Sequence, residues 1–235
     1  MKTIILAAGK STRLLPLTKE TPQAMLKIGA ETILEKQVKL LKKVGLDDLV
    51  VITGYLSRKL EEFCRELRIK TLFNPFYDVS GIAASLWIAK NEIKNGFLFL
   101  SSDVLFEPET IRGLLEQEGD ICLAVQKNDL RAEAEKIVEE SGLIKRISKV
   151  KLAKENSEFI GIAKFSEHGA EKLIKELENE LKDNLETSFI TVIDNLVQKG
   201  EVAEAYDIKN AQFIDIDFPD DLIKAAEIFN QNGKQ

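Results

Sequence analysis

Residues 3–28 read TIILAAGKSTRLLPLTKETPQAMLKI and contain the most informative pattern in the chain. Its apolar start, residues 3–6, is typical of a buried strand. Small residues follow at positions 7–9, and they let a ligand approach the backbone closely. Consecutive backbone N–H groups in such a turn suit phosphate, and Arg13 adds a permanently charged fork for phosphate oxygens. The turn predicts phosphate binding, although a tight turn with a surface arginine shows the same local pattern.

Over its whole length the stretch resembles the signature of the nucleotidyltransferases that activate sugar phosphates and alcohol phosphates. The shared pattern is Leu-Ala-Ala-Gly-x-x-x-Arg, then Pro-Leu-Thr, then Pro-x-x-Met-Leu-x-Ile. In that family the loop wraps the triphosphate of a nucleotide. The resemblance therefore implies nucleotide contacts from Leu6, Ala7, Ala8, Gly9, Ser11, Thr12 and Arg13.

Gln23 departs from this family pattern. The family carries a lysine at this position that contacts the reacting phosphates, whereas a glutamine amide donates hydrogen bonds but carries no charge. Lys19 and Lys27 lie close in sequence and are candidates to replace that cation. We place Gln23 among the catalytic residues with Arg13 and Asp103. It also supports an alternative, a catalytically weak or inactive nucleotide-binding regulatory homologue.

Composition and charge limit the classes of function that the chain can have. The 235 residues are 44% hydrophobic and 31% charged, which predicts one globular domain over residues 1–235. The net charge is −6, and Lys and Arg are scattered, which argues against a nucleic-acid partner. No run reaches transmembrane length and the N-terminus does not resemble a signal peptide, so we expect no membrane partner and a cytoplasmic location. The oligomeric state stays open, with a homodimer as one option.

Apolar runs of strand length alternate with helical patterns in the first part of the chain. The expected elements are a helix at 33–44, a strand at 48–54, a helix at 55–67 and a strand at 71–74. This alternation predicts an α/β fold with a Rossmann-like, mixed, mostly parallel twisted sheet and helices on both faces, and the resemblance implies the nucleotide-diphospho-sugar transferase type. Ligands of such sheets bind outside the carboxyl ends of the strands, where Gly54 and Asn74 are expected.

Residues 74–87 read NPFYDVSGIAASLW and form a second recognisable segment. Asn-Pro opens a turn, and a helix is expected to begin at Ser80 or Ser85, with its first N–H groups aimed at the ligand edge. The segment resembles the base- and sugar-binding stretch of the CTP:phosphocholine cytidylyltransferase branch, except that Gly81 stands where those sequences commonly have Asn. The resemblance implies nucleotide contacts from Gly54, Asn74, Ala84 and Ser85.

Two aspartates each follow an apolar strand. Asp103 comes after the run at 97–100, and a carboxylate at the end of a central strand is a hard ligand suited to Mg²⁺. Residues 216–222, IDFPDDL, resemble the family's closing motif, whose first aspartate, here Asp217, is a second metal ligand. The resemblance implies that Asp103 and Asp217 share Mg²⁺, with carboxylates within about 6 Å of each other. Capping roles remain open for both, and Asp215 is expected to face the other side of its strand.

Residues 126–158 are rich in charge and weakly periodic. We interpret them as an excursion that covers the acceptor substrate, with a helix expected at 132–140. In the strand expected at 159–165, a glycine suggests a close backbone approach, and the family equivalent lines the acceptor pocket. Acidic side chains are candidates to bind an amino or hydroxyl group of the acceptor. The predicted acceptor-binding residues are Asp129, Glu158, Gly161 and Glu186.

The reaction that the resemblance implies joins a nucleoside triphosphate, with CTP favoured, to a small phosphomonoester and releases pyrophosphate. Phosphocholine, phosphoethanolamine and a sugar phosphate remain open as acceptors. The acceptor oxygen would attack the α-phosphorus in line, so catalysis rests on positioning and charge neutralisation.

Overall fold

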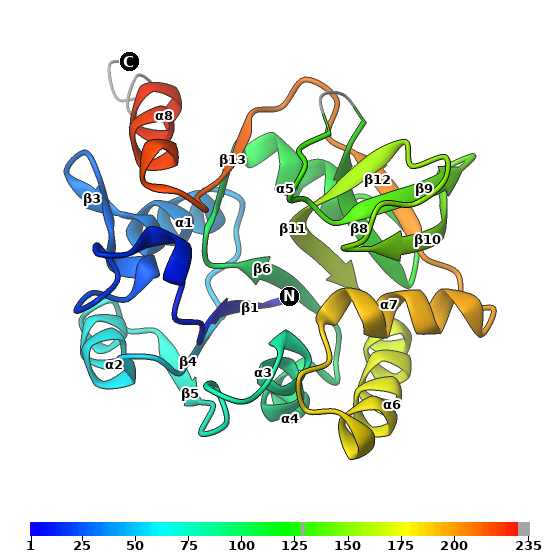
Figure 1. Ribbon diagram of the computed structural model, residues 1–235, viewed down its shortest axis with the longest axis horizontal. Coiled ribbons are helices and arrows are strands. Elements are labelled where there is room, and N and C mark those ends of the chain that lie inside the picture. Colours follow the sequence, from blue (N-terminus) through cyan, green and yellow to red (C-terminus); the bar gives the residue numbers. More distant parts are fainter. Residues whose placement is uncertain (128–129, 230–235) are drawn as a thin grey trace.

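The computed structural model describes residues 1–127 and 130–229 of the chain. A mixed sheet forms its centre (Figure 1). The strands of this sheet are β1 (Lys2–Ala7), β4 (Leu49–Thr53), β5 (Lys70–Phe73), β6 (Phe97–Ser101), β8 (Ile121–Gln126), β9 (Lys136–Glu140), β10 (Leu143–Ser148), β11 (Ser157–Phe165) and β12 (Glu204–Asp207). Two short ribbons complete the strands: β2 (Lys27–Ile28) with β3 (Glu31–Thr32), and β7 (Val104–Phe106) with β13 (Phe213–Asp215).

The strand order is β5-β4-β1-β6-β11-β8-β12-β10-β9. From β5 to β6 the neighbours are parallel. Strand β11 then pairs antiparallel with both β6 and β8, and β10 pairs antiparallel with β12 and β9. The predicted α/β class and mixed sheet are confirmed. The sheet divides into a parallel half, β5 to β6, and a half dominated by antiparallel pairs, β11 to β9.

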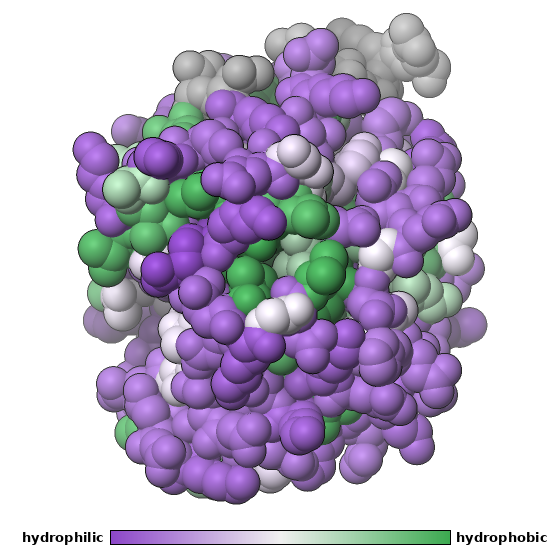
Figure 2. Space-filling view, turned by 90° about the vertical axis from the view of Figure 1, so that its right-hand side faces the viewer, coloured by the Kyte–Doolittle hydropathy of each residue, from purple (hydrophilic) through white to green (hydrophobic). Residues whose placement is uncertain are grey.

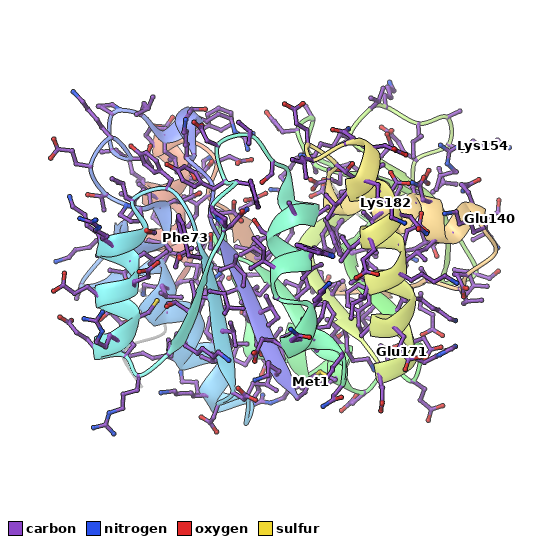
Figure 3. The ribbon with its side chains drawn as sticks, turned by 90° about the horizontal axis from the view of Figure 1, so that it is seen from below. Met1, Phe73, Glu140, Lys154, Glu171 and Lys182 are labelled. Carbon is purple, nitrogen blue, oxygen red and sulfur yellow. The ribbon has the colours of Figure 1, made fainter. Side chains whose placement is uncertain are left out.

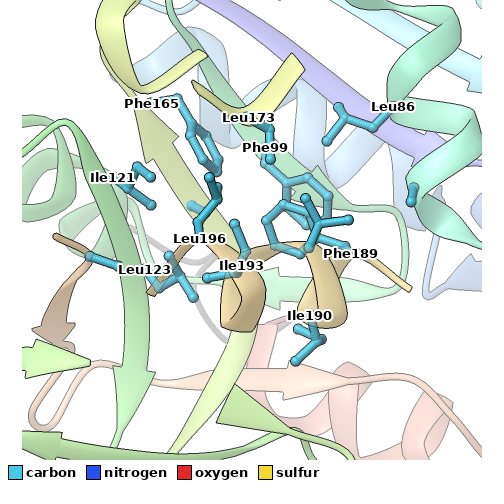
Figure 4. Close-up of a cluster of buried hydrophobic side chains, with 14 of the residues drawn as sticks. Leu86, Phe99, Ile121, Leu123, Phe165, Leu173, Phe189, Ile190, Ile193 and Leu196 are labelled. Carbon is cyan, nitrogen blue, oxygen red and sulfur yellow. The ribbon is translucent and has the colours of Figure 1, made fainter. Parts of the chain in front are cut away.

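Helices cover both faces of this sheet. They are α1 (Ile33–Lys43), α2 (Ser57–Glu66), α3 (Ile82–Ile88), α4 (Lys90–Ile93), α5 (Pro108–Leu115), α6 (Glu167–Asp183) and α7 (Phe189–Gln198). Helix α8 (Pro219–Phe229) packs instead against β2 and β13 of the short ribbons. Strand alternation distributes the core, because successive side chains point to opposite faces. Ile4 packs in the cluster with α3, α6 and α7, whereas its neighbour Ile5 packs with α1, α2 and α5. Figure 4 shows part of the first cluster, with Phe99 and Phe189 side by side.

The loops that matter for function lie at the carboxyl edge of the parallel strands. In Figure 3, Met1 marks the amino edge of the sheet, and Phe73, where β5 ends, lies nearer the opposite edge. The parallel register places the ends of β4, β1 and β6 together, since Leu6 pairs with both Ile52 and Ser101. This is the edge at which the sequence predicts the ligand.

One predicted element is wrong. The helix expected at 132–140 is replaced by strand β9, which pairs with β10 and with the start of β11. The charged composition of this segment suits a helix, but Ile137 is fully buried in the same core cluster as Ile4. Burial against neighbouring strands therefore overrides local propensity here.

The surface is predominantly polar. Figure 2 views the molecule from the right-hand side of Figure 1 and shows hydrophilic residues around a smaller hydrophobic area. None of the described helices is both long enough and apolar enough to span a membrane.

Candidate active site

The loop after β1 presents its backbone to an open cavity. Ser11 adopts a left-handed conformation with φ 49°, and a 3₁₀ turn, Thr12–Leu14, follows it. The Thr18 hydroxyl fixes this shape by donating to the Ser11 carbonyl at 3.0 Å. Within the described residues, no hydrogen bond uses the amide N–H groups of positions 9–11. Successive free amides in such a turn form a concavity for an anion.

A cavity of about 160 Å³ opens directly above this loop. Residues from four chain segments line it: the end of β1 with its loop, the turn at 23–24, the 77–85 segment, and the end of β6 with the turn after it. Of the predicted nucleotide-binding residues, it is lined by Leu6, Ala7, Ala8, Gly9, Ser11 and Ser85. Asp103 and Gln23 also line it. The small side chains of the loop therefore leave room for a ligand where the sequence predicts one.

Two of the other predicted nucleotide-binding residues, Gly54 and Asn74, do not line the cavity but lie beneath residues that do. Gly54 permits a close approach, because a Cβ there would lie 2.5 Å from the Ala8 carbonyl oxygen and 2.6 Å from Tyr77 Cβ. Asn74 is fully buried, and its side chain bonds within its own segment. Ala84 lies elsewhere, in a separate surface groove, and Thr12 is exposed beside the loop.

The helix predicted to start at Ser80 or Ser85 starts at Ile82, with Gly81 as its N-cap. Gly81 and Ala83 donate their amides to the carbonyls of Leu185 and Thr187, so these N–H groups do not face the ligand. A Cβ at Gly81 would lie 2.2 Å from the Thr187 carbonyl oxygen. The departure from Asn at this position thus follows from the close passage of the 185–187 segment.

Three aspartates meet beside the cavity. Strand β13 pairs with β7 in a register that sets Asp215 opposite Val104, next to the turn that carries Asp103. The Ile216 amide donates to the Asp103 carbonyl at 3.0 Å, which brings Asp217 to the same place. One carboxylate oxygen from each of Asp103, Asp215 and Asp217 lies within 4.8 Å of the others. The predicted proximity of Asp103 and Asp217 is confirmed, and their role as metal ligands stays a prediction.

The expectation that Asp215 faces away from Asp217 is wrong. Residues two apart in a strand point to the same face, because the side-chain period of a strand is two. The i, i+2 spacing of the two aspartates already carried this signal. Among the described residues no α8 amide donates to the Asp217 carboxylate, which forms an ion pair with Arg13, while the Asp221 carboxylate accepts the amides of Asp217 and Phe218 at 3.2 and 2.9 Å.

Gln37 on α1 holds the turn that carries Asp103. Its side-chain amide is fully buried and donates to the carbonyls of Ser101 and Val104 at 2.9 and 2.8 Å. These carbonyls flank the turn on both sides. Sequence reasoning missed this residue, since a polar side chain within an amphipathic helix gives no sign of its partners.

Crowding and burial shift the pKa values of the aspartates upward. Burial raises the pKa of Asp103 to about 6, with a further rise from the charge of Asp217. Burial and the neighbouring carboxylates of Asp103 and Asp217 raise the pKa of Asp215 to about 8. Burial also raises the pKa of Asp217, against the lowering effect of Arg13. Three carboxylates at this spacing repel one another unless a cation joins them.

Two arginines partly offset this negative charge. Arg13 forms an ion pair with Asp217, and its guanidinium lies 5.5 Å from the centre of the Phe218 ring. Arg131 lies 3.3 Å from Asp215 and donates to Glu158 at 2.8 Å. The sequence predicts Arg13 as a phosphate ligand, which stays a prediction, and it gave no signal for Arg131.

Gln23 connects the loop after β1 (residues 7–13, predicted to bind phosphate and named the phosphate loop) to the segment that carries Asp215 and Asp217. Its amide nitrogen donates to the Ile216 carbonyl at 2.6 Å, and its amide oxygen accepts the Ser11 hydroxyl. Lys19 and Lys27 are exposed and line none of the cavities at this edge. Neither lysine therefore stands in the place of the missing cation.

A second cavity, of about 380 Å³, adjoins the first and shares Ile82, Ser101 and Asp103 with it. Phe99, Phe159 and Phe189 line one side, and the rings of Phe99 and Phe189 stack at 4.2 Å (Figure 4). The other side is charged. It carries Glu133, Glu135 and Lys149 from the segment before β9 and after β10, together with Arg13, Asp215 and Asp217.

The four predicted acceptor-binding residues lie in different places. Gly161 lines the second cavity at φ +79°, and a Cβ there would lie 2.9 Å from Val104. Glu158 lines a third cavity of about 410 Å³ that continues from the second, and it is paired with Arg131. Glu186 is exposed and lines none of these cavities, although its backbone passes beside Gly81. Asp129 lies outside the described residues.

Comparison with known proteins agrees with this geometry. The model of the MobA-like NTP transferase domain matches residues 3–180. The chain belongs to this family of nucleotidyltransferases. The match begins in β1 and spans the phosphate loop, Asp103 and all of α3, so it includes the first cavity and most of the second.

Two relatives show how similar this chain is to named cytidylyltransferases. The choline-phosphate cytidylyltransferase of Streptococcus pneumoniae is 34% identical over 107 residues, which cover 46% of this chain and 47% of that protein. The chain thus spans about half the length of this relative. The CTP:phosphoglutamine cytidylyltransferase of Campylobacter jejuni is 26% identical over 248 residues, covering 94% of this chain and 98% of that protein.

A solved structure confirms that the fold is shared. The inositol-1-phosphate CTP transferase from T. maritima superposes with a TM-score of 0.86 at 24% identity, over 99% of this chain and 96% of that one. The nucleotide-diphospho-sugar transferase fold is therefore present in full, including the antiparallel half that the sequence described poorly.

Proposed function

We propose that the protein is a Mg²⁺-dependent cytidylyltransferase that joins CTP to a small phosphomonoester and releases pyrophosphate. One observation carries this proposal. Asp103 lines both the cavity over the free loop amides and the larger charged cavity beside it, and it forms a cluster with Asp215 and Asp217. Two phosphate-bearing substrates held in these cavities would meet at the three carboxylates.

The choice of CTP and of a phosphomonoester rests on the relatives. The names of the three similar proteins described above indicate CTP as the nucleotide and choline phosphate, phosphoglutamine and inositol 1-phosphate as acceptors. These acceptors share a phosphate and differ in the group that it carries. The phosphate of the acceptor therefore takes part in the reaction in every case. The segment at 126–158 is suited to bind the group that the phosphate carries, which differs from one acceptor to the next. A cytoplasmic location, where CTP is available, belongs to the same proposal.

The reaction is a phosphoryl-type transfer at the α-phosphorus of CTP. An oxygen of the acceptor phosphate forms the new P–O bond as the bond to the β,γ-diphosphate breaks, and pyrophosphate leaves with the electron pair. The free amides at positions 9–11 would hold the β,γ-phosphates, which become the leaving group. Arg13 extends from the same loop and would exchange its ion pair with Asp217 for a phosphate oxygen. Positioning supplies most of the rate in such a site.

The residues present fit a Mg²⁺ ion. Three carboxylates converge within 4.8 Å, and two of them have pKa values raised by burial and mutual repulsion, a penalty that a divalent cation would relieve. Asp103, Asp215 and Asp217 would hold the ion, and Gln37 would keep the first of them in place. When bound, Mg²⁺ would neutralise charge on the reacting phosphates.

A substrate panel tests the proposal. CTP, UTP, GTP and dTTP are each combined with phosphocholine, phosphoethanolamine, phosphoglutamine, inositol 1-phosphate and glucose 1-phosphate, and pyrophosphate release is measured with and without Mg²⁺. We expect release with CTP and at least one acceptor, and only with the metal. Asp103→Asn should lower turnover by about 10²- to 10³-fold. Asp47→Asn, an exposed aspartate before β4, is the matched control and should not change it.

The same panel distinguishes the alternative of a regulatory homologue. Nucleotide binding without pyrophosphate release across all combinations would contradict an enzyme and favour a nucleotide-binding role. Release with UTP or dTTP and not CTP would overturn the choice of nucleotide while leaving the family reaction in place.

A further inference from the structure

A stripe of four charged side chains runs along the outer face of α6. Its members are Glu171, Lys175, Glu178 and Lys182, and all four are exposed. Spacings of four, three and four residues keep them on one face, because a helix has about 3.6 residues per turn. Figure 3 looks onto this side of the molecule, with Glu171 and Lys182 labelled on α6. Acidic and basic residues therefore alternate along an open helix face.

The charges of this stripe do not neutralise one another within the helix. A glutamate four residues before a lysine is a favourable pair on a helix, yet among the described residues no two members of the stripe form a salt bridge with each other. Glu178 pairs instead with Lys90 at 3.1 Å, and Lys182 donates to Asn179 at 3.5 Å. The Lys175 side chain forms no ion pair with a described residue. The stripe is thus open to charges from outside the chain.

An apolar groove of about 360 Å³ adjoins the stripe and shares Glu178 and Lys182 with it. Its other lining residues come from the segment at 76–88 and from the end of α6, namely Phe76, Ala84, Trp87, Ile88, Leu181 and Leu185. Phe76 and Leu185 are 48% and 44% exposed. Contiguous exposed apolar side chains with a charged rim are typical of protein contact surfaces.

The order of the charges makes the stripe complementary to its own reversed copy. In a two-fold interface, a contact from one residue to a second is repeated from the second to the first. When two copies of α6 lie antiparallel with the axis between residues 176 and 177, Glu171 faces Lys182 of the second copy and Lys175 faces Glu178. All four charges of each stripe then meet an opposite charge. Two copies that run parallel in the same register would oppose like charges.

We propose that this face of α6, together with the apolar groove, is the interface of a two-fold symmetric homodimer. The self-complementary charges select a second copy of this chain as the occupant. The groove supplies apolar area, and the exposed ion pairs fix the register of the two helices more than they add affinity. The inference is independent of the proposed reaction, because none of the residues of the stripe or the groove lines the three cavities around the aspartates.

Sedimentation velocity of the full-length protein over a range of concentrations tests the inference. We expect a reversible dimer with a Kd in the micromolar range, because the groove is small for a protein interface. The Kd should rise with salt concentration, since the ion pairs are exposed. A native protein that stays monomeric up to about 1 mM overturns the inference.

Two charge exchanges with the same composition and net charge test the register. Glu171→Lys/Lys175→Glu places like charges opposite each other at both pairs and should raise the Kd by about 10-fold or more. Lys175→Glu/Glu178→Lys exchanges the charges within one symmetric pair, so opposite charges still face each other and the Kd should change by less than about 3-fold.

A role of the stripe within the helix alone predicts the reverse order. The second exchange breaks the ion pair of Glu178 with Lys90 and puts like charges four residues apart, so it is the more harmful one for an isolated helix. Equal Kd values for the two exchanges, or a larger loss of dimer in the second, overturn the inference.

Leu185→Ser tests the groove in the same experiment. It replaces an exposed apolar side chain and should raise the Kd about 10-fold while the melting temperature is unchanged. Ile223→Ser is the matched control, because Ile223 is 62% exposed on α8, away from α6 (Figure 1). A dimer that is weakened equally by both serine variants, or by neither, does not use this groove and overturns the inference.

Discussion

The two halves of the sheet build their parts of the site in different ways. The parallel half forms the first cavity from backbone amides, small residues and a buried asparagine. The antiparallel half contributes charged side chains to the second cavity, namely Glu133, Glu135 and Lys149, which lie opposite a side lined by phenylalanines. A backbone-lined cavity suits the phosphates that are common to all nucleotides. A side-chain-lined cavity can change its specificity by substitution, as the different acceptors of the relatives suggest.

The aspartate cluster lies at the junction of the halves, so breaking it should have the largest effect. Asp215→Asn removes one charge from the cluster and should lower turnover by about 10²- to 10³-fold with every acceptor. The reason is that all acceptors deliver their phosphate to the same carboxylates. Steady-state pyrophosphate release measures this loss. Asp220→Asn, an exposed neighbour in the chain, is the control, and an acceptor-dependent loss would assign Asp215 to the acceptor cavity alone.

Substituting Arg13 and Arg131 one at a time tests whether CTP and the acceptor are bound by different halves of the sheet. The expected effects are smaller than that of Asp215→Asn. Arg13 extends from the phosphate loop, whereas Arg131 contacts Glu158 in the antiparallel half. Arg13→Ala should weaken CTP binding by about 10-fold, more at low salt, because a charged phosphate contact is lost. Arg131→Ala should raise the acceptor KM by about 10-fold and leave CTP binding unchanged.

Calorimetry and steady-state kinetics on both variants complete that comparison. The exposed arginine variant Arg58→Ala on α2 serves as the control for lost surface charge. If each arginine variant affects both substrates equally, the two cavities act as one site and the division between the halves does not hold for binding.

The pH dependence of stability reports on the cluster without any substrate. The pKa of Asp103 rises from 3.8 to about 6 and that of Asp215 from 3.8 to about 8, so the folded protein binds more protons than the unfolded chain between these values. A difference of one pKa unit corresponds to about 1.4 kcal/mol, so the metal-free protein should lose stability, on the order of several kcal/mol, as the pH rises from 4 to 8. Mg²⁺ should restore stability at pH 8 and have little effect at pH 5.

Thermal unfolding at the two pH values, with and without Mg²⁺, measures this effect. Asp215→Asn removes the group with the larger shift and should flatten the pH dependence of the metal-free protein. Stability that increases from pH 4 to 8 without metal would contradict the raised pKa values.

Much of the parallel half was predictable from the sequence, because its signals are local. An apolar strand followed by small residues predicts the phosphate loop, and an apolar strand ending in Asp103 predicts an acidic tip at the same edge. The antiparallel half was less predictable. Strand β9 has a charged sequence, and only its pairing with β10 and β11 makes it a strand.

The residues that sequence reasoning missed act through long-range contacts. Arg131 meets Asp215 across 84 positions of the chain, and Gln37 meets Val104 across 67. No periodicity or motif connects such pairs. Asp215 differs, because its spacing from Asp217 carried the correct signal and the interpretation of strand alternation was wrong.

Substitution of Gln23 should have the smallest effect on turnover. It tests whether the cavity of the parallel half lacks a positive charge. The Gln23 amide bridges the Ser11 hydroxyl and the Ile216 carbonyl, beside the aspartate cluster. In Gln23→Lys the ammonium can still donate to that carbonyl and adds a positive charge near the reacting phosphates. Charge there stabilises the transition state only if its interaction grows as the reaction proceeds. We expect turnover to rise about 3- to 10-fold while CTP affinity changes by less than about 2-fold.

The neutral variant Gln23→Met distinguishes the effect of an added charge from the effect of losing the hydrogen bonds to Ser11 and Ile216. It keeps the approximate length of the side chain but removes both hydrogen bonds, so it should lower turnover if the bridge positions the loop. A lysine variant that is faster than the native protein, beside a slower methionine variant, would show that the site uses the bridge and also lacks a cation. If both variants are slower, the bridge matters more than the missing charge. Arg13 and Lys149, which both line the second cavity, are then the cations to test for contact with the reacting phosphates, because Lys19 and Lys27 line neither cavity.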